Sequence, residues 1–296
     1  MFTRMHGVVV PLTTPFCDDG SVDYDTAASL TKYLVEAGIR WLFPCGTTGE
    51  MHFLTCEEKK QLADTVVKAA GEKAGVFVQC GSITEKETIS MIEYARKAGA
   101  AGAGIVTPSF FGLTEDELVD YYKRVSAAAG EDFPIYLYNI PQCSGNDISF
   151  RACERIAYGC PNVIGIKYSQ SDANRVCDYL SIRNYNFSVL VGLERQYLGY
   201  LALGCDGVVS GCAIITPGLF LDLYDAYISG DIQKAQLLQR KIDKVYSMLT
   251  KNKSIARVKA GEQIIGFGNG KMREPLSAVS LNEYHELEKE LEEFLK

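Results

Sequence analysis

The stretch Val163-Ile164-Gly165-Ile166-Lys167 decides the fold, because an uninterrupted apolar run ends there in a charged residue. A second run of the same kind, Ile135-Tyr136-Leu137, precedes it in the chain. Strands that are apolar at consecutive positions are buried on both faces, as parallel sheets beneath helices require. We therefore expect both runs to be strands of a parallel sheet covered by helices.

Short apolar runs alternate with longer segments of helical spacing from residue 7 almost to residue 228. The runs predict eight strands, at 7–12, 41–45, 75–80, 103–107, 134–139, 163–167, 187–192 and 207–210. Apolar residues at three- and four-residue spacing predict intervening helices such as 24–37, 55–70, 84–98 and 114–129. Thr55 and Thr114 each stand three residues before a glutamate, which is the capping-box pattern of a helix start.

Eight strand–helix units favour a closed (β/α)8 TIM barrel, and α/β barrels of about this length fold as one domain. A doubly wound open sheet is the alternative, because a sequence counts strands imperfectly. Beyond residue 230 there are no clear strands, and helical periodicity runs over Ile232–Leu249 and 283–295. We expect a barrel domain at 1–230 and a C-terminal helical extension at 231–296.

Composition excludes several kinds of partner and cofactor. The formal net charge of -7, with no long basic run, argues against binding to nucleic acid or to an anionic membrane. The ten cysteines include no C-x-x-C pair and there are only three histidines, so no metal site is expected. The first ten residues lack the apolar core of a secretory signal, and no stretch approaches the ~20 apolar residues of a membrane span. We expect a cytoplasmic protein with mostly buried, reduced cysteines.

Two glycine-rich stretches do not predict a nucleotide site. Gly266-Phe267-Gly268-Asn269-Gly270-Lys271 lacks the spacing of a phosphate loop and is expected to join two helices. Gly99-Ala100-Ala101-Gly102-Ala103-Gly104 precedes a strand instead of opening a helix, which is the wrong order for dinucleotide binding. No cofactor is therefore expected.

Catalytic groups of such a barrel lie where its strands end. Gly46-Thr47-Thr48-Gly49-Glu50 follows the second strand, and its hydroxyls and amides can hold a carboxylate, although an ordinary turn has the same composition. The fifth strand ends in Tyr138-Asn139-Ile140-Pro141, whose phenol can transfer protons or can simply be a partly buried aromatic.

Lys167 ends the sixth strand at the expected barrel mouth. Removing an ammonium from water favours the neutral amine, which can attack a ketone and form a Schiff base. A lysine that reaches back to solvent or pairs with a carboxylate is the alternative.

The motifs GTTGE at 46–50, Thr107-Pro108, YNIP at 138–141 and GIK at 165–167, in this order, resemble those of one family. It is the dihydrodipicolinate synthase and N-acetylneuraminate lyase family of Schiff-base aldolases, and the similarity runs from GVVVPLTTPF at 7–16 through Pro217. The resemblance implies a (β/α)8 barrel with extra C-terminal helices that forms a dimer or tetramer.

By this resemblance Lys167 is the Schiff-base lysine, Tyr138 transfers protons, and Thr47 and Thr48 hold the carboxylate of pyruvate. Pyruvate condensed on Lys167 becomes an iminium, an electron sink that lets an enamine form and attack an aldehyde, or lets the reverse cleavage proceed. The expected partners are pyruvate and an aldehyde, and no metal is needed.

Departures from the family pattern bear on the substrate. Relatives that make dihydrodipicolinate resemble Y-N-V-P-x-R-T-G, whereas Cys143 stands here in the arginine's place. The sialic-acid lyases carry two adjacent acids after the seventh strand, whereas this chain has Gly192-Leu193-Glu194-Arg195. We expect Gly192, Glu194, Arg195 and Cys143 to contact the distal end of the substrate.

The sequence therefore favours reversible cleavage of a 2-keto-3-deoxy sugar acid or an N-acetylneuraminate-like 2-oxo acid. One alternative is 4-hydroxy-tetrahydrodipicolinate synthase, which condenses pyruvate with aspartate semialdehyde. Another is a non-catalytic ligand-binding barrel, against which the presence of Lys167 and Tyr138 speaks.

One further departure concerns the proton relay. Many relatives resemble T-P-Y-Y or T-P-F-Y after the fourth strand, whereas this chain reads Thr107-Pro108-Ser109-Phe110-Phe111. Phe110 cannot pass a proton, so the relay is expected to end at Tyr138 and Thr47, or to use water or Ser109. If the tyrosine of the relatives serves only as an aromatic wall, Phe110 is equivalent to it.

Overall fold

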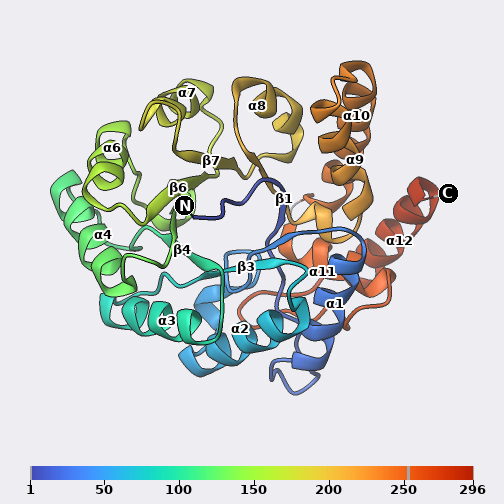
Figure 1. The fold of residues 1–296 in the computed structure, drawn as a ribbon. Coiled ribbons are helices and arrows are strands. Elements are labelled where there is room, and N and C mark those ends of the chain that lie inside the picture. The colour runs from blue at the N-terminus through green and yellow to red at the C-terminus, as the bar shows by residue number, and fades with distance from the viewer. Residues whose placement is uncertain (1, 252–253, 296) are drawn as a thin grey trace.

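A computed structural model describes residues 2–251 and 254–295, and it shows a closed barrel of parallel strands. The strands form a ring with the helices outside it (Figure 1). Neighbouring strands follow the order of the sequence, and β1 closes the ring by pairing with β8. The strands are β1 Gly7–Val10, β2 Trp41–Leu42, β3 Gly75–Gln79, β4 Gly102–Val106, β5 Ile135–Asn139, β6 Val163–Tyr168, β7 Ser188–Val191 and β8 Gly207–Val209. The predicted TIM barrel is confirmed, and the open doubly wound sheet is wrong.

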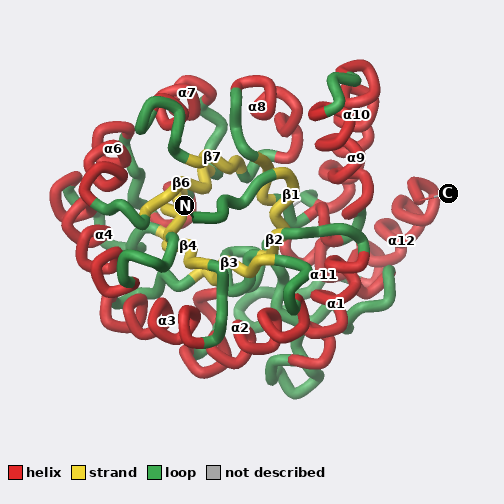
Figure 2. The backbone as a smooth tube through the Cα atoms, viewed as in Figure 1, coloured by secondary structure: helices red, strands yellow, loops and turns green. Residues whose placement is uncertain are grey.

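Helices surround the ring of strands (Figure 2). The outer helices are α1 Tyr24–Glu36, α2 Cys56–Ala70, α3 Glu85–Lys97, α4 Glu115–Ala129, α6 Phe150–Gly159, α7 Ala173–Ser181, α8 Tyr197–Leu203 and α9 Pro217–Ile228. Short helical turns follow four strands: η1 Met51–Phe53, α5 Pro141–Ser144, η2 Glu194–Gln196 and η3 Cys212–Ile214. Both predicted capping boxes are present, with Thr55 and Thr114 accepting from the backbone three residues on.

The apolar runs are buried on both faces, as their sequence predicts. Every residue of β4, β5 and β6 is buried. Gly165 interrupts the run of β6 because a Cβ there would lie 2.5 Å from the ring of Tyr136, which fills the barrel interior. The packing of large rings inside the barrel thus needs a glycine at the paired position of the neighbouring strand.

Three helices follow the barrel: α10 Ile232–Leu249, α11 Ser254–Ile264 and α12 Leu281–Leu295. The sequence predicts α10 and most of α12, and the glycine-rich stretch at 266–271 joins α11 to α12 as expected. It does not predict α11, because residues 256–262 are buried on every side and therefore show no one-sided apolar spacing.

The expected domain boundary at residue 230 stays a prediction, and residues 1, 252, 253 and 296 of the two expected segments lie outside the described part. Within residues 2–251 and 254–295, no helix is long and apolar enough to cross a membrane. The same residues contain no cluster of three or more His, Cys, Asp and Glu side chains suited to a metal ion.

Candidate active site

A cavity of about 400 Å³ lies at the ends of the strands and brings together the three motifs that carry the expected chemistry. It is lined by Lys167 from β6, Tyr138 from β5, and Thr47 and Thr48 from the turn after β2. Cys143, Gly192 and Glu194 also line it, as predicted for the substrate's distal end. Seven residues from distant parts of the chain therefore share one cavity.

Lys167 is the next-to-last residue of β6 and is buried, with 6 % of its surface exposed. Its Nζ lies 3.8 Å from the centre of the Tyr138 ring and 5.1 Å from the centre of the Phe43 ring. The two aromatic faces hold the Lys167 amine in the cavity, which favours this position over a lysine that reaches back to solvent.

Tyr138 is buried, and its phenol oxygen lies 3.0 Å from Oγ1 of Thr47. Either group can donate this hydrogen bond, so a proton can pass in either direction between them. The ring of Phe43 meets Tyr138 edge-on, at 6.1 Å between centroids, and fixes its orientation.

The turn that carries Thr47 and Thr48 has little freedom. Cys45 and Glu50, on either side of it, have positive φ angles of 62° and 58°. The carbonyl of Gly49 accepts a 2.7 Å hydrogen bond from Oγ1 of Thr14, and a Cβ on Gly49 would lie 3.0 Å from the carbonyl oxygen of Leu12. The segment after β1 therefore supports the turn from behind.

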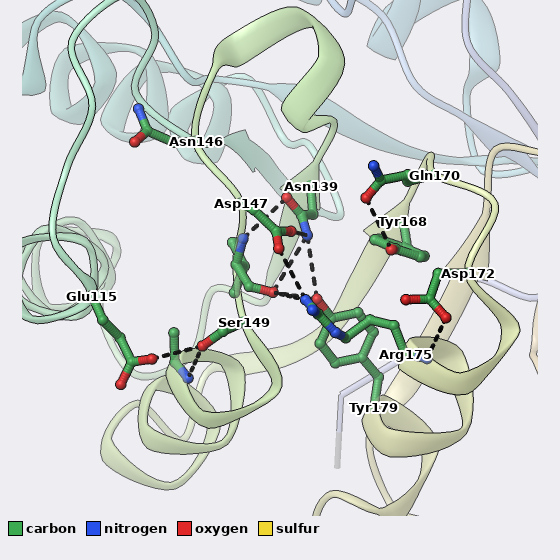
Figure 3. Close-up of polar contacts among 12 residues, drawn as sticks. Glu115, Asn139, Asn146, Asp147, Ser149, Tyr168, Gln170, Asp172, Arg175 and Tyr179 are labelled. Carbon is green, nitrogen blue, oxygen red and sulfur yellow. Dashed lines mark hydrogen bonds and ion pairs between the residues drawn. The ribbon is translucent and has the colours of Figure 1, made fainter.

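A polar network behind β5 fixes the segment that brings Cys143 to the cavity (Figure 3). Nδ2 of Asn139 donates to Oδ1 of Asp147 at 2.8 Å, and the backbone N–H of Ile148 donates to Oδ1 of Asn139 at 3.2 Å. Arg175 on α7 pairs with Asp147 at 3.0 Å. Because Asn139 and Asp147 flank residues 140–146, the network holds both ends of this segment.

The residues after β7 point in different directions. Oε1 of Glu194 accepts a 3.0 Å hydrogen bond from Ser210, and burial raises the pKa of Glu194 while the charge of Lys167 opposes that shift. Arg195 does not line the cavity: it is exposed, with its guanidinium carbon 5.8 Å from the ring centre of Tyr246 on α10. Of the residues predicted for the substrate's distal end, Arg195 alone lies outside the cavity wall.

The relay position also lies outside. Phe110 is 90 % exposed and lines neither this cavity nor the smaller apolar one of about 180 Å³ beside it. Ser109 lines the smaller cavity, which shares Thr47, Ile140, Cys143 and Ile255 with the larger one. Of the hydroxyl groups that the sequence singles out, those of Tyr138, Thr47 and Thr48 line the Lys167 cavity and that of Ser109 does not.

The C-terminal helices supply part of the cavity wall, which the sequence does not indicate. Tyr246 and Thr250 come from α10 and its end, and Ser254, Ile255 and Val258 come from α11. Gln142 and Ser169 are further lining residues without a sequence signal. The cavity is therefore built by the barrel and the extension together.

Solved structures of one class of protein are similar to this chain over nearly its whole length. Dihydrodipicolinate synthase from Aquifex aeolicus superposes with a TM-score of 0.93 at 28% identity, over 98% of both chains. A prophage protein of the dihydrodipicolinic acid synthase family from E. coli K12, solved in complex with pyruvate, superposes with a TM-score of 0.93 at 25% identity, over 99% of both chains. These neighbours share the whole architecture, including the C-terminal helices.

The family follows from the sequence as well. The model of the dihydrodipicolinate synthetase family matches residues 4–294, and an uncharacterized DapA-like lyase of Halobacterium salinarum is 33% identical over 97% of this chain and 93% of its own length. The chain belongs to the dihydrodipicolinate synthetase family and is a lyase, so the expected family is confirmed.

Proposed function

We propose that this aldolase forms a Schiff base between Lys167 and pyruvate, and reversibly cleaves a hydroxylated 2-oxo acid to pyruvate and an aldehyde. The observation that carries the proposal is the buried Lys167 amine, which faces the cavity beside the hydrogen-bonded pair Tyr138 and Thr47. A nucleophile next to a proton carrier, in one cavity, is the arrangement that covalent aldol chemistry needs.

The steps follow from these groups. The neutral amine of Lys167 attacks the C2 ketone of the 2-oxo acid, and loss of water from the carbinolamine gives an iminium. Removal of the C4 hydroxyl proton then breaks the C3–C4 bond, releasing the aldehyde while the electron pair enters the iminium to form an enamine. Protonation at C3 and hydrolysis by water release pyruvate and the amine. Tyr138 carries protons in these steps, and Thr47 and Thr48 hold the carboxylate.

The cavity lining supports a neutral, hydroxylated aldehyde half. Among the described residues that line the cavity, Lys167 is the only cation, and Cys143 stands where a second carboxylate would need an arginine. Glu194, Gln142 and Ser169 offer acceptors or donors for hydroxyl groups. We therefore favour a 2-keto-3-deoxy sugar acid or an N-acetylneuraminate-like acid.

Two other functions would need different groups in the cavity. Condensation of pyruvate with aspartate semialdehyde is supported by the similarity to dihydrodipicolinate synthase from Aquifex aeolicus, but this reaction needs a cation for the second carboxylate. A non-catalytic binding barrel would not need the Lys167 amine and the Tyr138 phenol in one cavity.

We further infer that the enzyme forms a homo-oligomer, a dimer or tetramer, and works in the cytoplasm. All ten cysteines are free, and Cys143 and Cys177 are exposed thiols, which supports a reducing compartment.

The test is borohydride reduction in the presence of pyruvate, followed by intact mass and peptide mapping. The expected result is one lactyl-sized addition at Lys167, and none in Lys167→Ala, which should also lose turnover. Equal labelling of Lys167→Ala and wild type would show that another amine reacts and would overturn the assignment.

A further inference from the structure

The mechanism leaves unused a buried ion pair beside the smaller cavity, which Glu50 helps to line. Nζ of Lys259, on α11, donates to Oε1 of Glu50 at 2.7 Å, with the two side chains 3% and 0% exposed. The other carboxylate oxygen of Glu50 accepts from the backbone N–H of Arg273 at 3.0 Å. Both oxygens of one glutamate after β2 are therefore held by the C-terminal part of the chain.

Stability alone is a weak reason for such a pair. Burying two charges costs desolvation, and well-packed apolar residues of the same volume are often as stable or more so. A buried ion pair does, however, fix the relative position of the two segments that carry it. The segment on the Glu50 side is the one that matters for chemistry.

Glu50 is the last residue of the Gly46–Glu50 turn and closes it. Its backbone N–H donates to the carbonyl of Thr47 at 3.0 Å. Its φ of 58° is a left-handed backbone conformation, which a residue other than glycine keeps only when the surrounding structure holds it there. A shift of Glu50 would thus move the carbonyl of Thr47, whose Oγ1 lies 3.0 Å from the phenol oxygen of Tyr138.

Lys259 is itself held rigidly. Its ammonium lies 4.2 Å from the centre of the Phe16 ring, and one turn further along α11 Glu262 accepts a 2.6 Å hydrogen bond from Thr13. On the same helix, Ile255 and Val258 line the catalytic cavity. The helix therefore contacts the segment after β1, the turn after β2 and the substrate space.

We propose that Lys259 is a positioning residue, which holds the Thr47–Thr48 turn through Glu50 in the geometry that receives the carboxylate of pyruvate. This inference rests on the proposed function, in which that turn holds pyruvate. Loss of the ion pair lets the turn relax and weakens pyruvate binding, while the Lys167 amine itself stays in place. The effect should fall on the pyruvate concentration dependence more than on the final extent of Schiff-base formation.

The experiment measures the pyruvate concentration that half-saturates borohydride trapping at Lys167, alongside the melting temperature. The variants are Lys259→Met, the conservative Lys259→Arg, and the double variant Glu50→Gln with Lys259→Met, which removes both charges of the ion pair together. Arg257→Met is the matched control: Arg257 is a buried cation on the same helix, but it donates to Met248 at 2.6 Å and pairs with Glu290, away from the turn.

In Lys259→Met and in the double variant we expect the half-saturating pyruvate concentration to rise at least about tenfold, with the same trapped mass at saturation. Lys259→Arg should recover most of the affinity, and Arg257→Met should lower the melting temperature with an unchanged pyruvate dependence. If Lys259→Met does not fold, the half-saturating pyruvate concentration of the double variant tests the positioning role.

A lower melting temperature with wild-type pyruvate dependence would overturn the inference, as would an equal loss of affinity in Arg257→Met. These outcomes differ from failure of the proposed function, which would appear as absent trapping at Lys167 in the wild-type enzyme.

Discussion

Lys167 and Tyr138 stand opposite each other on neighbouring strands, with the Lys167 nitrogen 3.8 Å from the centre of the Tyr138 ring. The register of β5 and β6 therefore fixes the distance between the proposed nucleophile and the proposed proton carrier. Groups placed by strand pairing are held more precisely than groups placed by loops. The chemical centre can thus stay constant while the segments around it change the substrate.

Tyr138→Phe should lower kcat by at least about 10²-fold, because the Tyr138 ring lies against Lys167 and its phenol oxygen lies 3.0 Å from Oγ1 of Thr47. Tyr246, the other phenol among the described lining residues, comes from α10. Tyr136→Phe is the control: this tyrosine lies on the same strand, but its hydroxyl bonds to Ser188 inside the barrel at 2.8 Å. The measurement is kcat under conditions where chemistry limits the rate. A near-wild-type kcat in Tyr138→Phe would point to water as the proton carrier.

Aspartate semialdehyde should be a poorer substrate, by kcat/KM, than a 2-keto-3-deoxy sugar acid. The reason is that the cavity has Cys143, which carries no positive charge, where an arginine would bind the carboxylate of aspartate semialdehyde. Cys143→Arg should improve kcat/KM for aspartate semialdehyde by about tenfold or more, since a charge-assisted hydrogen bond contributes about 1.5–3 kcal/mol. Cys177→Arg, at an exposed site on α7, should change nothing. Greater efficiency of the wild-type enzyme with aspartate semialdehyde would reverse the substrate assignment.

Glu194→Gln should weaken the reaction with a sugar acid by about tenfold, because one charged acceptor for a substrate hydroxyl is lost. Trapping of pyruvate at Lys167 should be unchanged, since Glu194 is expected to contact only the distal end. Comparing kcat/KM with pyruvate trapping separates the two effects. Weaker pyruvate trapping in Glu194→Gln would show instead that this carboxyl acts on the Schiff-base end.

Glu262→Gln should remove a pH dependence of stability. Burial raises the pKa of Glu262 to about 7 from 4.5, so the folded state keeps a proton that the unfolded state loses as pH rises. This contribution to stability is complete below pH 4.5, declines as pH rises, and is lost above about pH 7; its full size is about 3 kcal/mol at most.

The check is thermal unfolding at pH 5 and pH 8. Glu262→Gln should be stabilised relative to wild type more at pH 8 than at pH 5. Glu57→Gln, at an exposed position that pairs with Lys60, should show the same change between the two pH values as wild type. An identical pH response in wild type and Glu262→Gln would contradict the assignment.

The sequence predicts the barrel well because strands buried on both faces leave a plain signal, an unbroken apolar run. The predicted strands extend past the observed ones, since rim residues such as Cys45 and Thr107 are buried without belonging to a strand. Spacing cannot reveal α11, which is buried all round and includes charged residues. The Glu50–Lys259 pair joins positions 209 residues apart, and no local pattern encodes it.

The candidate site is predictable where strand ends fix it and less so elsewhere. Lys167, Tyr138 and Thr47 lie in one cavity because all strands of a parallel barrel end at the same rim. Arg195 follows Glu194 directly but turns away, because successive residues of the helical turn η2 point in different directions. Adjacency in sequence thus says little about which side chain reaches the substrate.

The contact between Thr13 and Glu262 spans 249 residues. A chain emerging from the ribosome can pair its strands in order, because each strand follows its neighbour. The part of the cavity wall that α11 supplies can form only after α11 has been synthesised. Until then, the space that will hold the substrate is open to bulk water. Catalytic competence therefore arrives near the end of synthesis, well after the sheet has the residues it needs to close.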